Sequence, residues 1–178
     1  MAQLVMNWCN DGTPAQAPVF PAGVELKTIP QIENGVQEWL DIVNHMEQHG
    51  VADNDEKLYQ DVMIGRPDYS EDKCFFLTVD GKPAATVTVL CDYAKKAGTI
   101  HMVSCKPGFR GMGLGRLLSD VAMYTLKNEG METASLRTDD WRIPAIKTYL
   151  RIGMKPDLVS EPDYVARWDA IMAIVNGK

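Results

Sequence analysis

Apolar residues recur along the chain in two patterns, one typical of strands and the other of helices. Runs rich in β-branched and aromatic residues predict strands at 24–29, 74–79, 84–91, 99–105 and 133–137. Apolar positions spaced three or four apart predict helices at 33–47, 54–64, 114–128, 143–152 and 163–175. Residues 1–22 follow neither pattern, so we expect there either a disordered arm or a strand-like cover on the domain.

Turn signals and element order indicate how these segments pack. Asp80-Gly81 separates two strands and predicts a hairpin. The strand–helix–strand order over 99–137 predicts a parallel strand pair with a right-handed crossover. We therefore expect an α/β fold with a central mixed, largely antiparallel sheet and helices on both faces. The 178 residues contain no linker or repeat, which favours one domain over 1–178 with 1–22 as an N-terminal arm.

Charge and cysteine usage narrow the class of protein. A net charge of −6 argues against broad nucleic-acid binding. The four cysteines form no CxxC pair, which argues against a zinc ribbon and fits a reducing cytoplasm. The first residues resemble no signal peptide, and no run is long enough to span a membrane. His45 and His49 enclose Met-Glu-Gln and so lack the HExxH pattern, and we expect no metal.

A glycine-rich turn links the strand that ends near Cys105 to the helix that begins near Leu114. Its glycines, at 111, 113 and 115, fit neither the P-loop spacing nor the dinucleotide-binding spacing. Glycine lets backbone approach a ligand, and the unpaired amides of a helix start attract anions. A plain glycine-rich loop is the alternative. Arg110 and Arg116 flank this turn, and the combination predicts a diphosphate site.

These residues resemble the GCN5-related N-acetyltransferase (GNAT) family. The sequence Arg110-x-x-Gly113-x-Gly115 looks like the family's acetyl-CoA signature, and the segment 105–111 is similar to its usual lead-in. The stretch 142–154 resembles the family's later motif, although Arg142 stands where asparagine is more common and Met154 replaces phenylalanine. The resemblance is close over 72–156, the expected acetyl-CoA-binding core, and covers 24–71 only by element order.

The resemblance implies acetyl-CoA as co-substrate and no metal. In the family, the strand before the glycine turn splays from its parallel neighbour and the pantetheine arm lies in the gap. The residues implied in cofactor binding are Val103, Ser104, Cys105, Arg110, Gly111, Met112, Gly113, Leu114, Gly115 and Arg116.

Two side chains are implied in catalysis. Tyr149 aligns with the family's tyrosine and would protonate the leaving thiolate, the alternative being a packed aromatic residue. Thr99 occupies the place of the family's frequent glutamate and cannot act as a base. His101 lies two residues further, on the same face of the strand, and is either the general base or a histidine bonded to nearby backbone. The Asp139-Asp140 pair either attracts a cationic acceptor or forms a solvated loop.

The sequence therefore predicts an N-acetyltransferase in which an amine attacks acetyl-CoA directly within a ternary complex. Cys105 is not favoured as a covalent nucleophile, because it lies inside a strand. The missing strand glutamate motivates an alternative, a non-catalytic acyl-CoA-binding regulatory domain. The resemblance also allows a longer acyl donor and a homodimer. Trp39, Trp141 and Trp168 are expected to be packing residues, with a wall of the acceptor site as the alternative for Trp141.

Overall fold

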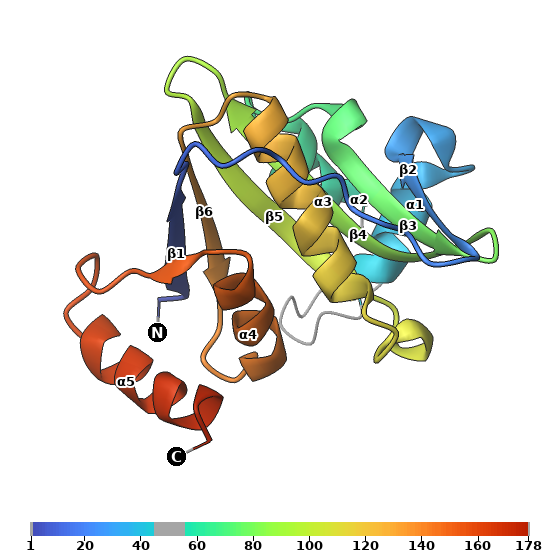
Figure 1. Ribbon diagram of the computed structural model, residues 1–178. Helices are drawn as coiled ribbons and strands as arrows, with labels where there is room; N and C mark the ends of the chain where they lie inside the picture. The colour runs from blue at the N-terminus through green and yellow to red at the C-terminus, as the bar shows by residue number, and fades with distance from the viewer. Residues whose placement is uncertain (1, 45–55, 178) are drawn as a thin grey trace.

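The computed structural model describes residues 2–44 and 56–177, which form a seven-stranded sheet with helices on both faces (Figure 1). The strand order is β2-β3-β4-β5-β6-β1-β7. The strands are β1 (Leu4–Cys9), β2 (Val24–Thr28), β3 (Cys74–Val79), β4 (Lys82–Asp92), β5 (Ala97–Cys105), β6 (Thr133–Thr138) and β7 (Lys155–Pro156). The α-helices are α1 (Gly35–Val43), α2 (Glu56–Tyr59), α3 (Leu114–Asn128), α4 (Ile143–Arg151) and α5 (Tyr164–Val175).

The sheet is mixed and largely antiparallel, which confirms the predicted fold class. Its parallel pair is β5 and β6, joined through α3. The β3–β4 hairpin turns at Asp80 and Gly81, whose φ angles of 48° and 79° fit a two-residue turn of type I′.

The N-terminal residues enter the sheet itself. β1 pairs antiparallel with β6 from Leu4 opposite Thr138 to Cys9 opposite Thr133, and its other edge pairs with β7. The segment is thus an internal strand, and the expected arm or cover is confined to the residues between β1 and β2. Residues 10–21, which we call the strap, leave β1 and cross α3 on the way to β2 (Figure 1).

Two apolar clusters hold the helices on the sheet. One cluster contains the buried side chains of α3 and is called the α3 cluster, and the other contains those of α1 and is called the α1 cluster. Successive residues of β3 point to opposite faces of the sheet, so Phe75 and Leu77 lie in the α3 cluster and Phe76 lies in the α1 cluster. The predicted inner stripe of α3 is confirmed, since every member is buried: Leu114, Leu117, Leu118, Val121 and Leu126. The predicted packing of the tryptophans is confirmed for Trp39 and Trp168 but wrong for Trp141, which is 53% exposed.

The two N-terminal helices differ from the expected ranges. α1 starts at Gly35 because Asn34 has a left-handed φ of 53°. α2 runs into a π-helical turn, η2 (Gln60–Ile64), in which the Gly65 amide donates to the Gln60 carbonyl at 2.8 Å. Three expectations fall outside the described residues. They are the end of the first helix at 45–47, the start of the second helix at 54–55, and the pair His45 and His49.

Candidate active site

β5 and β6 pair only where each begins. The ladder joins Ala97–Thr99 to Thr133–Ser135 and then stops, although both strands continue and diverge (Figure 1). Over residues 100–105, β5 therefore has a strand partner on its β4 side alone within the described part of the chain. Backbone groups on such an open edge need hydrogen-bond partners, which an amide-bearing ligand supplies.

A β-bulge reorients β5 beside this opening. Met102 and Val103 lie opposite the single residue Val87 of β4, and Met102 has a φ of 53°. The bulge reverses the alternation of side chains along the strand. Ile100 and Val103 both pack in the α3 cluster, whereas Met102 packs in the α1 cluster. The order of apolar and polar residues in the sequence did not predict this bulge.

The glycine turn presents unpaired amides at the start of α3. Gly111 and Gly113 have φ angles of 82° and 79°, which favour glycine. The first helical bond runs from the Leu117 amide to the Gly113 carbonyl at 3.1 Å. The amides of residues 111–116 donate to no acceptor among residues 2–44 and 56–177. Side-chain atoms built on these glycines would meet open space, so the turn can accept an anion from outside.

Side chains around the turn differ in what they contact. Arg110, Met112 and Arg116 are exposed, and Leu114 is buried beneath the helix start. Ser104 is buried, and its hydroxyl donates to the Ile42 carbonyl at 2.9 Å. Its side chain therefore anchors α1 to β5, which leaves only its backbone for a ligand.

The Cys105 thiol is half-buried near the same turn. Burial raises the pKa of the thiol, and Arg110 opposes the shift. The S–H group donates to the Lys106 carbonyl at 3.5 Å. A thiol that keeps its proton is a poor nucleophile, which agrees with the prediction that Cys105 forms no covalent intermediate.

His101 faces the α2 side of the sheet. Its Nε2 lies 3.1 Å from the carbonyl oxygen of Val62, within η2. The structure thus contains the backbone contact named as the alternative to a catalytic role. A carbonyl only accepts hydrogen bonds, so the neutral ring carries its proton on Nε2 and keeps Nδ1 as the basic nitrogen. The contact and a role as base are therefore compatible.

Tyr149 lies on the opposite face, in the cluster that also contains α3. Its side chain is buried, and desolvation raises the pKa of the phenol to about 12 despite the nearby positive charge of Arg142. The phenol keeps its proton at neutral pH, as a general acid requires. Groups on opposite faces of a sheet can act on one ligand only where the strands part, as β5 and β6 do.

The loop between β6 and α4 is tied by ion pairs. Asp140 accepts from Arg167 of α5 at 2.5 and 3.0 Å, which lowers the pKa of that carboxyl. Asp139 lies 3.3 Å from the Arg142 Nε, and the Arg142 guanidinium stacks over Trp141 at 4.9 Å. The two carboxylates are thus engaged by arginines of the same chain.

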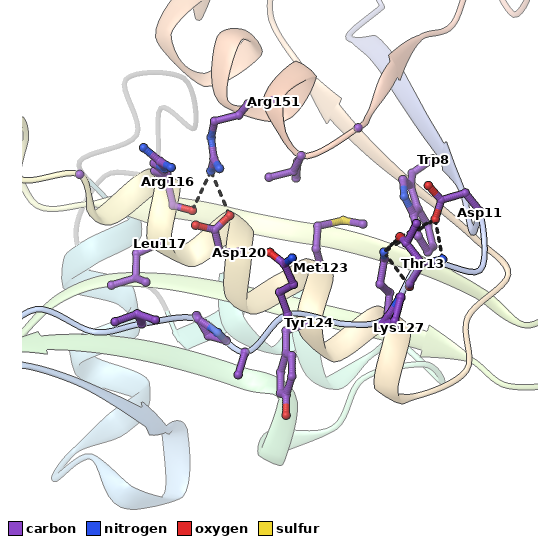
Figure 2. Close-up of a pocket in the computed structure, with 18 of the residues that line it drawn as sticks. Trp8, Asp11, Thr13, Arg116, Leu117, Asp120, Met123, Tyr124, Lys127 and Arg151 are labelled. Carbon is purple, nitrogen blue, oxygen red and sulfur yellow. Dashed lines mark hydrogen bonds and ion pairs between the residues drawn. The ribbon is translucent and has the colours of Figure 1, made fainter.

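A large cleft continues from the glycine turn along α3, and no feature of the sequence predicted it (Figure 2). It has a volume of about 1250 Å³ and lies between α3, the strap and the end of α4. Trp8, Lys127 and Arg151 line it, and none belongs to a recognisable motif. The proline-rich stretch before residue 22 marks the irregular segment that forms one wall, but it gives no sign of a cleft.

Metal-ligand clusters and membrane-spanning helices are both missing from the described ranges. Across 2–44 and 56–177, no group of three or more histidine, cysteine or acidic residues is arranged to hold a metal ion. In the same residues, no helix has both the length and the apolar character needed to cross a membrane.

The parallel strands of the mixed sheet thus part beside a helix start whose amides are unpaired, an arrangement that suits a ligand with amide and diphosphate groups. The chain belongs to the acetyltransferase (GNAT) family, whose pattern matches residues 36–154. This confirms the predicted family.

Named relatives agree at modest identity. The chain is 28% identical over 149 residues to a mycothiol acetyltransferase from Streptomyces scabiei, covering 80% of this chain and 46% of that protein. It is 29% identical over 103 residues to an uncharacterized N-acetyltransferase from Methanocaldococcus jannaschii, covering 55% of this chain and 43% of that one. The chain thus spans about half the length of these relatives.

Solved structures share the fold. A GCN5-related N-acetyltransferase from Sphaerobacter thermophilus matches 88% of this chain and 50% of its own, with a TM-score of 0.61 and 18% identity. The ribosomal-protein-S18-alanine N-acetyltransferase from Escherichia coli matches 73% and 76%, with a TM-score of 0.59 and 20% identity. At these identities the likeness establishes the arrangement of strands and helices.

Proposed function

We propose that this protein transfers the acetyl group of acetyl-CoA to an amine in a ternary complex. The supporting observation is the continuity of two unpaired backbone surfaces, the β5 edge over 100–105 and the amides of residues 111–116. The first suits the amides of a pantetheine arm and the second suits a diphosphate. Because backbone supplies most of these contacts, the identity of Arg110 or Arg116 matters less than the shape of the turn.

The base in this proposal is His101. A protonated amine must lose its proton before its nitrogen attacks the thioester carbon. The Nε2 contact to Val62 assigns the basic lone pair to Nδ1, and it holds the ring on the face of β5 that carries Thr99. The imidazole therefore replaces the strand carboxylate in accepting that proton, directly or through water.

The acid is Tyr149. When the tetrahedral intermediate collapses, the carbon–sulfur bond breaks and the sulfur leaves with the electron pair. The phenol then donates a proton to the thiolate, which yields the free thiol of coenzyme A. Tyr149 projects from α4 into the cluster below α3, on the side opposite His101.

The test is turnover with acetyl-CoA and a panel of amines, measured as release of the coenzyme A thiol. The panel contains an alkyl amine, an amino-acid amide, an aminoglycoside, a peptide with a free N-terminus and a blocked peptide with one lysine. We expect thiol release with at least one acceptor. Tight binding of acetyl-CoA without release of the coenzyme A thiol in the presence of any acceptor would favour a regulatory domain, provided that Tyr149→Phe also leaves the assay result unchanged. The cytoplasmic location and a homodimer stay predictions.

A further inference from the structure

A row of polar side chains joins β5 to the helices on one face of the sheet. These helices are α1, α2 and η2, which we call the α1–η2 layer. His101, Ser104 and Lys106 all reach this layer, because the β-bulge shifts the alternation of side chains between the first and the second of them. Their partners are, in that order, the Val62 carbonyl, the Ile42 carbonyl and two carboxylates of α1.

The Lys106 ammonium lies between those two carboxylates. Its Nζ donates to Glu38 Oε2 at 3.0 Å and lies 2.6 Å from Asp41 Oδ2. Glu38 and Asp41 are three residues apart and so lie on one face of α1. Desolvation lowers the pKa of the ammonium, but its hydrogen bonds to Asp41 and Glu38 outweigh this effect and raise the pKa. Lys106 therefore carries its charge at neutral pH.

This ion pair differs from the exposed pairs of the same protein. The Lys106 side chain is 18% exposed, whereas that of Lys95, which pairs with Asp92 at 2.8 Å, is 79% exposed. Water screens an exposed pair, which then contributes little. The apolar contacts of the α1 cluster have no preferred direction, whereas a shielded ion pair requires one geometry. The pair at Lys106 therefore fixes where α1 stands along β5.

Contacts within the α1–η2 layer carry this constraint to His101. Trp39 of α1 and Tyr59 of α2 are both buried, and their rings meet edge to face with centroids 5.2 Å apart. η2 follows α2 directly and contains Val62, whose carbonyl contacts the imidazole of His101. The layer is thus attached to β5 at two places, at Lys106 beside the glycine turn and at His101 within the strand.

We propose that Lys106 is a positioning residue for the amine acceptor. Its ion pairs with Glu38 and Asp41 hold the α1–η2 layer on β5, and the layer holds the imidazole that receives the proton of the amine. The donor lies along the open edge of β5 in the proposed function, so loss of the ion pairs should affect the acceptor and spare donor binding. This inference rests on that proposed function.

The first test is the side-chain NMR signal of His101 in protein labelled at histidine and free of ligand. The chain has three histidines, and the signal that is missing from His101→Gln identifies His101. Its Nε2 hydrogen exchanges slowly with water while it is bound to the Val62 carbonyl. We expect Lys106→Met to raise this exchange rate by at least about ten-fold, because the layer opens more often.

The second test separates acceptor use from donor binding. It uses the amine of the panel that gives the fastest thiol release. In Lys106→Met, kcat/KM for this amine should fall by about ten-fold, while the Kd of acetyl-CoA should stay within about two-fold. Lys106→Arg keeps a positive charge between the carboxylates and should recover most of the loss. Asp41→Asn removes one carboxylate and should give a smaller loss of the same kind.

The matched control is Lys95→Met at the other end of β5, where the ion pair with Asp92 is exposed. It should behave as the unmodified protein does in both tests. Thermal unfolding shows whether each variant folds. The Asp41 carboxylate is half-exposed, and Asp41→Asn leaves Lys106 paired with Glu38, so this variant keeps the test valid if Lys106→Met fails to fold.

The outcomes distinguish this inference from the proposed function. Unchanged kcat/KM for the amine in Lys106→Met overturns the positioning role, and so does an equal loss of donor affinity, while the acetyltransferase stands. A lower kcat/KM with unchanged exchange at His101 also overturns it, since Lys106 would then contact the acceptor itself. Faster exchange in Lys106→Met, without turnover of any amine by the unmodified protein, supports the attachment of the layer and refutes the proposed activity.

Discussion

The imidazole Nε2 of His101 lies 3.1 Å from the Val62 carbonyl oxygen, a group that has no backbone partner among the described residues of the π-helical turn. The Gly65 amide donates to Gln60 and the Arg66 amide to Met63. Residue 67 is proline and has no amide hydrogen. The histidine thus satisfies a carbonyl of the helix, and that same contact sets which ring nitrogen is basic.

Replacing His101 separates catalysis from packing. His101→Gln keeps an N–H group for the Val62 carbonyl but removes the titrating base. We expect kcat to fall by about 10²-fold or more with the donor Kd unchanged. A variant with unchanged kcat would assign His101 a structural role only.

Tyr149→Phe tests the acid. The apolar ring is retained, so the melting temperature should change little, while kcat should fall by about 10²-fold. Because the pKa of Tyr149 is raised to about 12, its loss of a proton should produce no basic limb in the unmodified enzyme below about pH 11. Pre-steady-state measurement of thiol release checks the rate directly. Equal release rates in both proteins would exclude Tyr149 as the acid.

Two glycines of the turn should respond differently to alanine. Gly113 has a left-handed φ of 79°, so Gly113→Ala should lower the free energy of unfolding by about 1–2 kcal/mol. Gly115 has an ordinary φ and open space around its Cα, so Gly115→Ala should leave stability unchanged or higher. Both methyl groups would stand at the amide cradle, and we expect both variants to bind acetyl-CoA at least ten-fold more weakly. Denaturant unfolding and calorimetry measure the two effects, and undiminished binding by Gly115→Ala would contradict the cradle.

Gly98 lies against Leu126 of α3, which leaves little room for a side chain at this position. A methyl group at this position would lie 2.1 Å from Leu126 Cδ2. Gly98→Ala should therefore displace the helix and lower the free energy of unfolding by roughly 1–3 kcal/mol. Gly108→Ala is the matched control, because Gly108 also has an ordinary φ but no neighbour within 4 Å of the added carbon. Similar urea midpoints for the two variants would show that the Leu126 side chain can move aside with little loss of stability.

Asp157 should make stability depend on acid pH. Amides of Val159 and Ser160, the Ser160 hydroxyl and the Asn7 side chain donate to its carboxylate and lower its pKa to about 2. The ionised form is favoured in the folded state, so this stabilisation is present above the unfolded pKa of about 3.9 and disappears as pH falls through about 2.

The corresponding variant is Asp157→Asn. We expect it to lower the free energy of unfolding by about 1–2 kcal/mol at pH 7, and the difference to vanish near pH 2. Urea unfolding at a series of pH values measures this, with Asp169→Asn on the exposed side of α5 as the control. A constant difference at all pH values would mean that the amide makes poorer contacts for reasons other than charge.

Local signals in the sequence predicted most of the fold. The strands of the hairpin, the ends of α3 and the parallel pair all derive from apolar period, turn residues and connection order. β1 escaped prediction because its partner β6 is more than a hundred residues away, and the prolines after it suggested irregular structure. The β5 bulge escaped because it depends on pairing with β4 and leaves no mark in composition.

The candidate site was predictable only where a compact motif carried it. The glycine turn and Tyr149 stand at distinctive spacings, whereas the cleft is assembled from the strap, α3 and the end of α4. Arg151 and Val19 look ordinary in sequence, and only tertiary structure places both in the lining of one cleft. The prediction for Trp141 was wrong for a related reason. Its ring stacks with the Arg142 guanidinium at the surface, a contact that the sequence does not reveal.

The position of β1 has a consequence for synthesis on the ribosome. Leu4–Cys9 cannot pair until Thr133–Thr138 has left the exit tunnel, so the apolar side chains of Leu4, Met6 and Trp8 stay without this strand partner while the residues between are synthesised. Closing so long a loop is slow. The nascent chain therefore exposes an apolar segment until β6 is made, and such a segment can associate with other chains during that interval.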